Sequence, residues 1–264
     1  MTSNNVRKRV LKMANECKRN THLGGALSMV EVLTVLYRDI MKYDFSNPAW
    51  EERDRFILSK GHCALTLDAI MVENQVISEE DSLTYLQDGS AYGAHPVMNI
   101  EHGIESSSGS LGQGISMAVG LAKAAKILGK SHKIYTLVGN GECDEGSVWE
   151  AVMLAAQWKL DNLTVIVDDN KLQGDGYSED IVDMSNLDER FAAFGFDVIS
   201  VDGHNEDEIK AAFMSKSEKK PKVIIAHTVK GKGVSFIEDD NSWHHNRLTD
   251  EMYRKAIEEL GGLA

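Results

Sequence analysis

The sequence predicts an α/β fold, with a mostly parallel β-sheet that carries helices on both faces. Two observations support this prediction. From residue 133 onward, short apolar segments rich in β-branched residues alternate regularly with amphipathic segments of helical period. Apolar strands that alternate with such helices are typical of a parallel sheet buried on both sides. The 264 residues suffice for one such domain with a sizeable core, and we expect a single domain over residues 1–264.

The predicted elements follow from hydrophobic period and turn residues. The predicted strands are residues 55–59, 134–138, 163–167, 196–201 and 223–227. The predicted helices are residues 6–18, 148–158, 187–194, 206–214 and 249–260, the last of them capped by Thr249. Ser28 and Glu31 have the spacing of a capping box, which predicts that a helix begins at Ser28 ahead of the next apolar run.

Composition limits the classes of function. The net charge of −13 argues against binding to nucleic acid or to an anionic membrane surface, because phosphates would be repelled. No run approaches the roughly 20 apolar residues that a membrane span needs. Cys17, Cys63 and Cys143 lie far apart, which indicates reduced thiols rather than a disulfide framework or a zinc site. No apolar segment follows the basic residues near the N-terminus, so we expect a cytoplasmic protein.

One long segment, residues 85–110, fits neither period and contains four glycines and two histidines. Irregular segments of this length are uncommon in compact domains and are usually functional or mobile. Ligands collect at the carboxyl ends of parallel strands, where most of the other unusual residues of this sequence also fall.

Two consecutive strands are each followed by an oxygen-bearing side chain. Asn140 follows the strand at 134–138 within a glycine-rich turn, and Asn170 follows the strand at 163–167. Adjacent parallel strands would bring these two residues together. Glycines let the backbone approach a phosphate closely, and a following helix N-terminus favours an anion. Amide, carbonyl and diphosphate oxygens form a shell suited to a hard cation such as Mg²⁺.

The glycine-rich turn alone is equally typical of an ordinary strand-to-helix connection with polar caps. A nicotinamide-binding fingerprint is a poorer match, because Gly139 and Gly141 are followed by the next glycine only at Gly146. The pair of strand-end ligands makes the diphosphate-and-metal interpretation more specific.

Six segments together resemble the diphosphate-binding domain of the transketolase family, in the family's order and approximate spacing. They are Gly139-Asn-Gly-Glu through Asp168-Asp-Asn170, Asn20-Thr-His22, Ser59-Lys-Gly-His62, Gly93-Ala-His95-Pro, Ser108-Gly-Ser-Leu-Gly-Gln-Gly114 and Trp243-His-His245. The resemblance covers nearly the whole chain and implies a thiamine-diphosphate-binding fold.

The resemblance also implies residue roles. The matching catalytic positions are His22, His95, His244 and Glu145, the last belonging to a carboxylate network at a subunit interface. The matching cofactor-binding positions are His62, Gly109, Ser110, Leu111, Gly141, Glu142, Asn170 and His244. The matching metal ligands are Asn140, Asn170 and Leu172, which would hold Mg²⁺, Ca²⁺ or Mn²⁺.

The sequence departs from the family pattern at a few positions. Asn140 stands where the family usually has aspartate, which removes one negative charge from the metal site, although an amide oxygen can still ligate. Ser110 and Leu23 each replace a usual proline. His245 replaces a usual glycine, and the resemblance implies no role for it. The four histidines that match no family position, and for which no role is implied either, are His102, His132, His204 and His227.

The resemblance implies that the pyrimidine-binding half of the enzyme is a separate, C-terminal transketolase subunit, with two copies of each chain in the assembly. The implied reaction moves a two-carbon ketol group from a ketose phosphate to an aldose phosphate. Alternatives are half of another thiamine enzyme, similar to a 2-oxo-acid dehydrogenase α chain or a deoxyxylulose-phosphate synthase, and a non-catalytic regulatory subunit that kept the fold. The segments at 20–28 and 108–114 favour transketolase among the enzymes.

Overall fold

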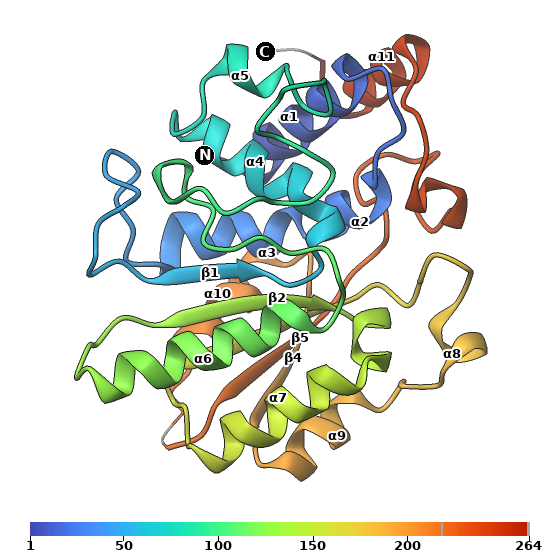
Figure 1. Cartoon of the computed structure of the whole chain (residues 1–264). Coiled ribbons are helices and arrows are strands. Elements are labelled where there is room, and N and C mark those ends of the chain that lie inside the picture. The colour runs from blue at the N-terminus through green and yellow to red at the C-terminus, as the bar shows by residue number, and fades with distance from the viewer. Residues whose placement is uncertain (218, 263–264) are drawn as a thin grey trace.

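The computed structural model describes residues 1–217 and 219–262. At its centre lies a five-stranded parallel sheet with strand order β1-β2-β3-β5-β4 (Figure 1). The strands are β1 (Arg55–Leu58), β2 (Ile134–Gly139), β3 (Leu163–Asp169), β4 (Asp197–Asp202) and β5 (Lys222–His227). All four pairings are parallel. The predicted strands are confirmed, with bounds that differ by one or two residues.

Eleven α-helical segments are present in the described residues. They are α1 (Ser3–Glu16), α2 (Leu23–Ser28), α3 (Val30–Val35), α4 (Ala64–Glu73), α5 (Glu79–Ser82), α6 (Gln113–Ile127), α7 (Gly146–Gln157), α8 (Ser178–Ile181), α9 (Leu187–Phe194), α10 (Glu206–Met214) and α11 (Asp250–Glu259). A π-helical turn continues α3 over Leu36–Ile40, and 3₁₀ turns occupy Gly61–Cys63, Ile100–His102, Gly141–Asp144 and Asn241–His244. Thr249 caps α11 as predicted, by accepting a hydrogen bond from Met252 N.

The sheet separates two hydrophobic cores, because successive strand residues point to opposite faces. Tyr135 and Leu137 pack on one face with α1 to α4, α10 and α11. Ile134 and Val138 pack on the other with α6, α7 and α9. Figure 1 shows α1 to α4 and α11 above the sheet and α6, α7 and α9 below it. The prediction of a parallel sheet with helices on both faces is confirmed.

The predicted capping box at Ser28 and Glu31 is wrong. Ser28 is the last residue of α2, and its hydroxyl donates to the Gly25 carbonyl and to the Asp168 carboxylate. Glu31 lies in α3 and accepts from Arg7 and His204. Both side chains are buried, and buried polar atoms need partners. Tertiary hydrogen bonds therefore took precedence over the local capping pattern.

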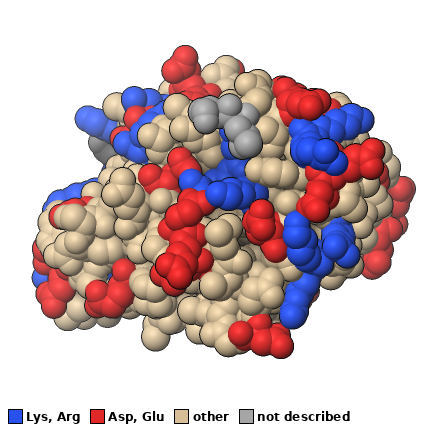
Figure 2. All heavy atoms as spheres, turned by 90° about the horizontal axis from the view of Figure 1, so that it is seen from above, with Lys and Arg blue, Asp and Glu red and all other residues tan. Residues whose placement is uncertain are grey.

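Residues 85–110 form a long, mostly irregular loop, as the lack of either period predicted. The segment contains one 3₁₀ turn, Ile100–His102, which lies between the two residues of an isolated antiparallel bridge, Asn99 and Ile104. Acidic and basic side chains are interspersed on the face drawn in Figure 2, and no continuous basic area covers it. Within the described residues, no helix combines the length and apolar character that crossing a membrane requires.

Candidate functional site

The carboxyl ends of β2 and β3 lie next to each other, as the spacing predicted. Gly139 is the register partner of Asp168, and Asn140 N donates to the Asp168 carbonyl over 3.1 Å. The chain then turns through Gly141, where a Cβ atom would lie 2.6 Å from Gln173 Cγ. Asn140 and Asn170 are both buried, at 6% exposure each. The two amides therefore meet at one edge of the sheet.

A cavity of about 270 Å³ opens at this edge. Ten of the predicted site residues line it: His22, His62, Gly109, Leu111, Asn140, Gly141, Glu142, Asn170, Leu172 and His244. They come from the loop before α2, the turn after β1, the turn before α6, the ends of β2 and β3, and the 3₁₀ turn before α11. Segments far apart in the sequence thus converge on one cavity.

His22 lies at the centre of a group of histidine rings. Its ring centroid is 5.2 Å from that of His62, 5.5 Å from that of His244 and 5.9 Å from that of His95. Burial, together with neighbouring positive groups, lowers the pKa of His22 and of His244 to about 4. Burial, with Lys60 next, lowers the pKa of His62 to about 2. These imidazoles are neutral near pH 7, so each can both accept and donate a proton.

Asp168 holds Asn170 in one orientation. The Asp168 carboxylate pairs with Lys60 and accepts hydrogen bonds from the Ser28 and Thr228 hydroxyls. Asn170 Nδ2 also donates to Asp168, over 3.0 Å, while Asn170 Oδ1 accepts from Leu172 N over 3.1 Å. Burial raises the pKa of Asp168, but Lys60 and the other donors outweigh burial and leave it below its usual value. The amide oxygen of Asn170 is thereby fixed on the side away from Asp168.

The amide of Asn140 has two possible orientations. In one, Nδ2 faces Asn170 Oδ1 at 3.3 Å and the Asp168 carbonyl at 3.1 Å, while Oδ1 accepts from Gly141 N and from the Ser178 hydroxyl. In the other, Oδ1 faces the same two oxygens, an arrangement that a cation between them would favour. The two amide oxygens of Asn140 and Asn170 therefore suit a hard cation but carry no charge of their own, and Leu172 lines the same cavity. No group of three or more histidine, cysteine or acidic side chains suited to a metal occurs in the described residues.

Comparison with known proteins identifies the family. The model of the transketolase thiamine diphosphate binding domain matches residues 3–262. This chain belongs to the transketolase family. It is 41% identical over 262 residues to an apulose-4-phosphate transketolase subunit of Phocaeicola vulgatus, covering 98% of this chain and 92% of that protein. It is 43% identical over 241 residues to the 6-deoxy-6-sulfo-D-fructose transketolase subunit of a Clostridium species, covering 90% of this chain and 88% of that protein.

Solved structures agree with this assignment. The transketolase of Leishmania mexicana superimposes with a TM-score of 0.91 at 30% identity, covering 98% of this chain and 41% of that one. The transketolase of Campylobacter jejuni gives 0.91 at 33% identity, covering 98% and 42%. This transketolase-family chain therefore corresponds to a little over two fifths of those longer polypeptides.

Three predicted site residues lie outside the cavity of this transketolase-family domain. His95 is exposed and packs beside Gly109, where a Cβ atom would meet its ring at 3.3 Å. Ser110 is also exposed. Glu145 is exposed at the N-cap position of α7, where its side chain makes no capping hydrogen bond. These three side chains face outward, where a second chain or a substrate could reach them.

Glu142 lines the cavity but has its own partners. Its carboxylate accepts from the Ser59 hydroxyl at 2.5 Å, from Gly112 N at 2.8 Å and from Gly139 N at 3.1 Å. Gly112 adopts a φ of +77°, and a Cβ atom there would lie 2.2 Å from Ser147 Oγ, so only glycine fits. Glu142 therefore fixes the turn before α6 against the end of β2.

Sequence reasoning missed Lys230, which lies in the glycine-containing loop after β5 and lines the cavity. Its Nζ donates to the Gln173 carbonyl and to Asn241 Oδ1, both at 2.9 Å, and lies 3.2 Å from His244 Nδ1. Burial, with Lys60 next, lowers the pKa of Lys230 to about 8. The signal in the sequence was its place just after a parallel strand, where ligands collect.

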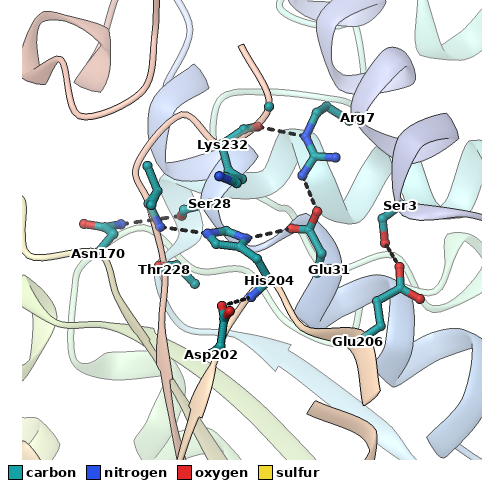
Figure 3. Close-up of polar contacts among 12 residues, drawn as sticks. Ser3, Arg7, Ser28, Glu31, Asn170, Asp202, His204, Glu206, Thr228 and Lys232 are labelled. Carbon is teal, nitrogen blue, oxygen red and sulfur yellow. Dashed lines mark hydrogen bonds and ion pairs between the residues drawn. The ribbon is translucent and has the colours of Figure 1, made fainter. Parts of the chain in front are cut away.

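The loop that carries Lys230 is held from both sides. Val229 N donates to His204 Nε2 at 2.8 Å, and His204 Nδ1 lies 3.1 Å from Glu31 (Figure 3). Arg7 pairs with the same Glu31 and donates from Nε to the Lys232 carbonyl at 2.8 Å. Since Nε2 of His204 accepts, Nδ1 carries the proton. His204, for which the sequence predicted no role, is part of the support of the cavity.

Proposed function

We propose that this chain is the diphosphate-binding subunit of a two-chain transketolase, which transfers a two-carbon ketol group from a ketose phosphate to an aldose phosphate. The observation that carries the proposal is the single cavity in which three neutral histidines, His22, His62 and His244, meet the strand-end amides Asn140 and Asn170. The names of the two relatives, both transketolase subunits, support it.

The residues that line the cavity have different roles in this proposal. When bound, thiamine diphosphate supplies the electron sink that allows the carbon–carbon bond beside a ketose carbonyl to break. His62 and Lys230 would bind the diphosphate, because they bring hydrogen-bond donors and, at Lys230, positive charge to the cavity. The backbone at Gly141 would also approach the diphosphate, and Gly109, Ser110 and Leu111 would contact the aminopyrimidine, as the resemblance implies.

Proton transfer falls to the histidines. His22, His95 and His244 would accept and return protons at substrate hydroxyls, since imidazole can serve as either acid or base. Lys230 Nζ donates toward His244 Nδ1, which leaves Nε2 as the protonated nitrogen of a neutral His244. A Cβ atom added to Gly174 would lie 3.6 Å from this Nε2 atom. Gly174 also lines the cavity, so the protonated nitrogen of His244 lies at the cavity wall.

A divalent cation, Mg²⁺ or alternatively Ca²⁺ or Mn²⁺, would be held by Asn140, Asn170 and the Leu172 carbonyl. These ligands are neutral, so the negative charge must come from the diphosphate. We expect the metal and the cofactor to bind together, with little Mg²⁺ bound by the chain alone.

The partner in this proposal is a pyrimidine-binding, C-terminal transketolase subunit, in an assembly with two copies of each chain. The relatives from Phocaeicola vulgatus and from the Clostridium species are each named as one subunit of a transketolase, which supports a partner. Glu145, exposed at the start of α7, would join a carboxylate network at that interface.

The test is reconstitution. The purified chain, a candidate partner chain from the same organism, and their mixture are assayed for ketol transfer with thiamine diphosphate and Mg²⁺. We expect transfer only in the mixture, together with much tighter cofactor binding. Robust turnover by this chain alone, with no partner detectable by mass spectrometry, would contradict the two-chain proposal. Tight cofactor binding by the mixture without transfer of any ketol would indicate a regulatory role instead.

A further inference from the structure

His245 is held beside His22 by the backbone. Thr21 and Asn246 form an isolated antiparallel bridge, with hydrogen bonds from Thr21 N to the Asn246 carbonyl at 2.9 Å and from Asn246 N to the Thr21 carbonyl at 3.1 Å. His22, which follows Thr21, and His245, which precedes Asn246, are therefore opposite each other across this bridge. The ring centroids of His22 and His245 are 4.6 Å apart, closer than His22 lies to His62, His95 or His244.

His245 occupies the outer side of His22. His22 lines the cavity and His245 does not. The side chain of His245 is exposed, and neither of its ring nitrogens has a hydrogen-bond partner within residues 1–217 and 219–262. His95, the other ring beside His22 that lies outside the cavity, is exposed as well. A substrate that passes from solvent to the cavity along His22 therefore meets the exposed imidazoles of His95 and His245.

We propose that His245 is a substrate-binding residue that hydrogen-bonds a hydroxyl of the sugar chain beyond the carbon–carbon bond that breaks, and thereby selects among sugars. This inference rests on the function proposed above. A neutral imidazole offers one donor and one acceptor, as a hydroxyl does, whereas phosphate and carboxylate groups are bound preferentially by arginine and lysine. The bridge between Thr21 and Asn246 restrains the backbone next to His245, so little backbone freedom is lost when the sugar binds.

The experiment uses the reconstituted two-chain enzyme and a set of ketose phosphates that differ in configuration at one hydroxyl. We compare the wild type with His245→Ala and with His245→Gln, which retains a donor and an acceptor. His132→Ala is the matched control, because His132 precedes β2 at the opposite edge of the sheet. We expect His245→Ala to reduce the ratio of kcat/KM values between preferred and poor donors by about tenfold, as for one lost hydrogen bond. The loss should appear mainly in KM.

His245→Gln should retain part of the discrimination, and the affinity for thiamine diphosphate should be the same in all four proteins. An equal loss of kcat/KM for every donor, or a loss that depends only on the terminal phosphate, would overturn the inference. The inference would also be overturned if His245→Ala kept the same ratio of kcat/KM values between preferred and poor donors as an active wild type. A wild-type mixture that transfers no ketol would overturn the proposed function, and this inference with it.

Discussion

Lys60 and Asp168 form an ion pair beside the cavity, and their side chains are only 3% and 1% exposed. Lys60 lies in the turn after β1, and Asp168 lies near the end of β3, two strands away. The pair also connects to α2 through Ser28 and to the loop after β5 through Thr228. The charges that orient Asn170 therefore also tie together four segments of the fold.

Removal of Lys60 should destabilise the fold strongly. Lys60→Met leaves the Asp168 carboxylate buried without its charge partner, and breaking a buried pair in this way costs about 3–5 kcal/mol. Urea denaturation measures the free energy of unfolding. The control is Lys130→Met, whose pair with Glu52 is solvent-exposed and should contribute little because water and salt screen it. Equal effects of the two substitutions would show that Lys60 is not paired as described.

The contribution of His62 to stability should fall as the solution becomes mildly acidic. The pKa of His62 is about 2 in the folded chain and about 6.5 when unfolded, so below pH 6.5 only the unfolded state gains this proton. The contribution of His62 is fully present above about pH 6.5 and is lost progressively as the pH falls toward 2. Between pH 7.5 and 5.5 this amounts to roughly 1 kcal/mol. His22 and His244 act in the same direction.

Urea denaturation at a series of pH values checks this expectation. His62→Gln keeps a polar side chain but removes the titration, so its stability should decline less between pH 7.5 and 5.5 than that of the wild type. Identical pH profiles for the two proteins would mean that His62 titrates normally in the folded chain.

The strands and the ends of β2 and β3 were predictable because their signals are local. Each strand is a short apolar run bounded by turn residues, and the register between Gly139 and Asp168 follows once the strands are neighbours. α6 was not predicted, because its buried face consists mainly of small residues such as Ala118 and Ala122. The buried and exposed faces of α6 therefore differ little in hydrophobicity, and the helical period is weak in the sequence.

The support of the site could not be predicted, because it depends on contacts between residues distant in sequence. Ser28 and Glu31 have the local pattern of a cap, yet their partners are Asp168, 140 positions away, and His204, 173 positions away. Lys230 follows a parallel strand but has no motif of its own, and its contacts with Gln173, Asn241 and His244 distinguish it from its neighbours in the loop. Tertiary partners of this kind are visible only in the folded chain.

His204 should affect cofactor binding, although no sequence motif predicted a role for it. His204→Ala removes the acceptor of Val229 N and one partner of Glu31, which should cost roughly 1–3 kcal/mol of stability. It should also loosen the loop that carries Lys230 and weaken thiamine diphosphate binding several-fold. His227→Ala serves as the control, since that side chain is half-exposed at the end of β5. Calorimetric titration with thiamine diphosphate in the presence of the partner measures the difference. Equal affinities of the two variants for the cofactor would contradict this role of His204.

Asn140→Asp tests the charge of the metal site. The two side chains have nearly the same shape, so the substitution changes charge rather than packing. In the amide, Nδ2 can bond to Asn170 Oδ1 and the Asp168 carbonyl when no cation is present. A carboxylate would instead face those two oxygens without a proton to share, so the empty site becomes less stable and the filled site more so. We expect Asn140→Asp to tighten Mg²⁺ binding by roughly 1–3 kcal/mol, as for a charge-assisted contact.

A calorimetric Mg²⁺ titration of both forms, with saturating thiamine diphosphate and partner, measures this difference. Asn140→Ala is the matched variant that lacks a ligand oxygen, and it should bind Mg²⁺ more weakly than the wild type. The same titration without cofactor should show little binding to the wild type, because its three ligands are neutral and Mg²⁺ gives up its water reluctantly. Equal affinity in all three proteins would exclude Asn140 as a ligand. The Glu142 carboxylate already accepts hydrogen bonds from Ser59, Gly112 and Gly139. The next carboxylate to test as a metal ligand would then be Asp144, whose Oδ1 is buried without a partner in the described residues.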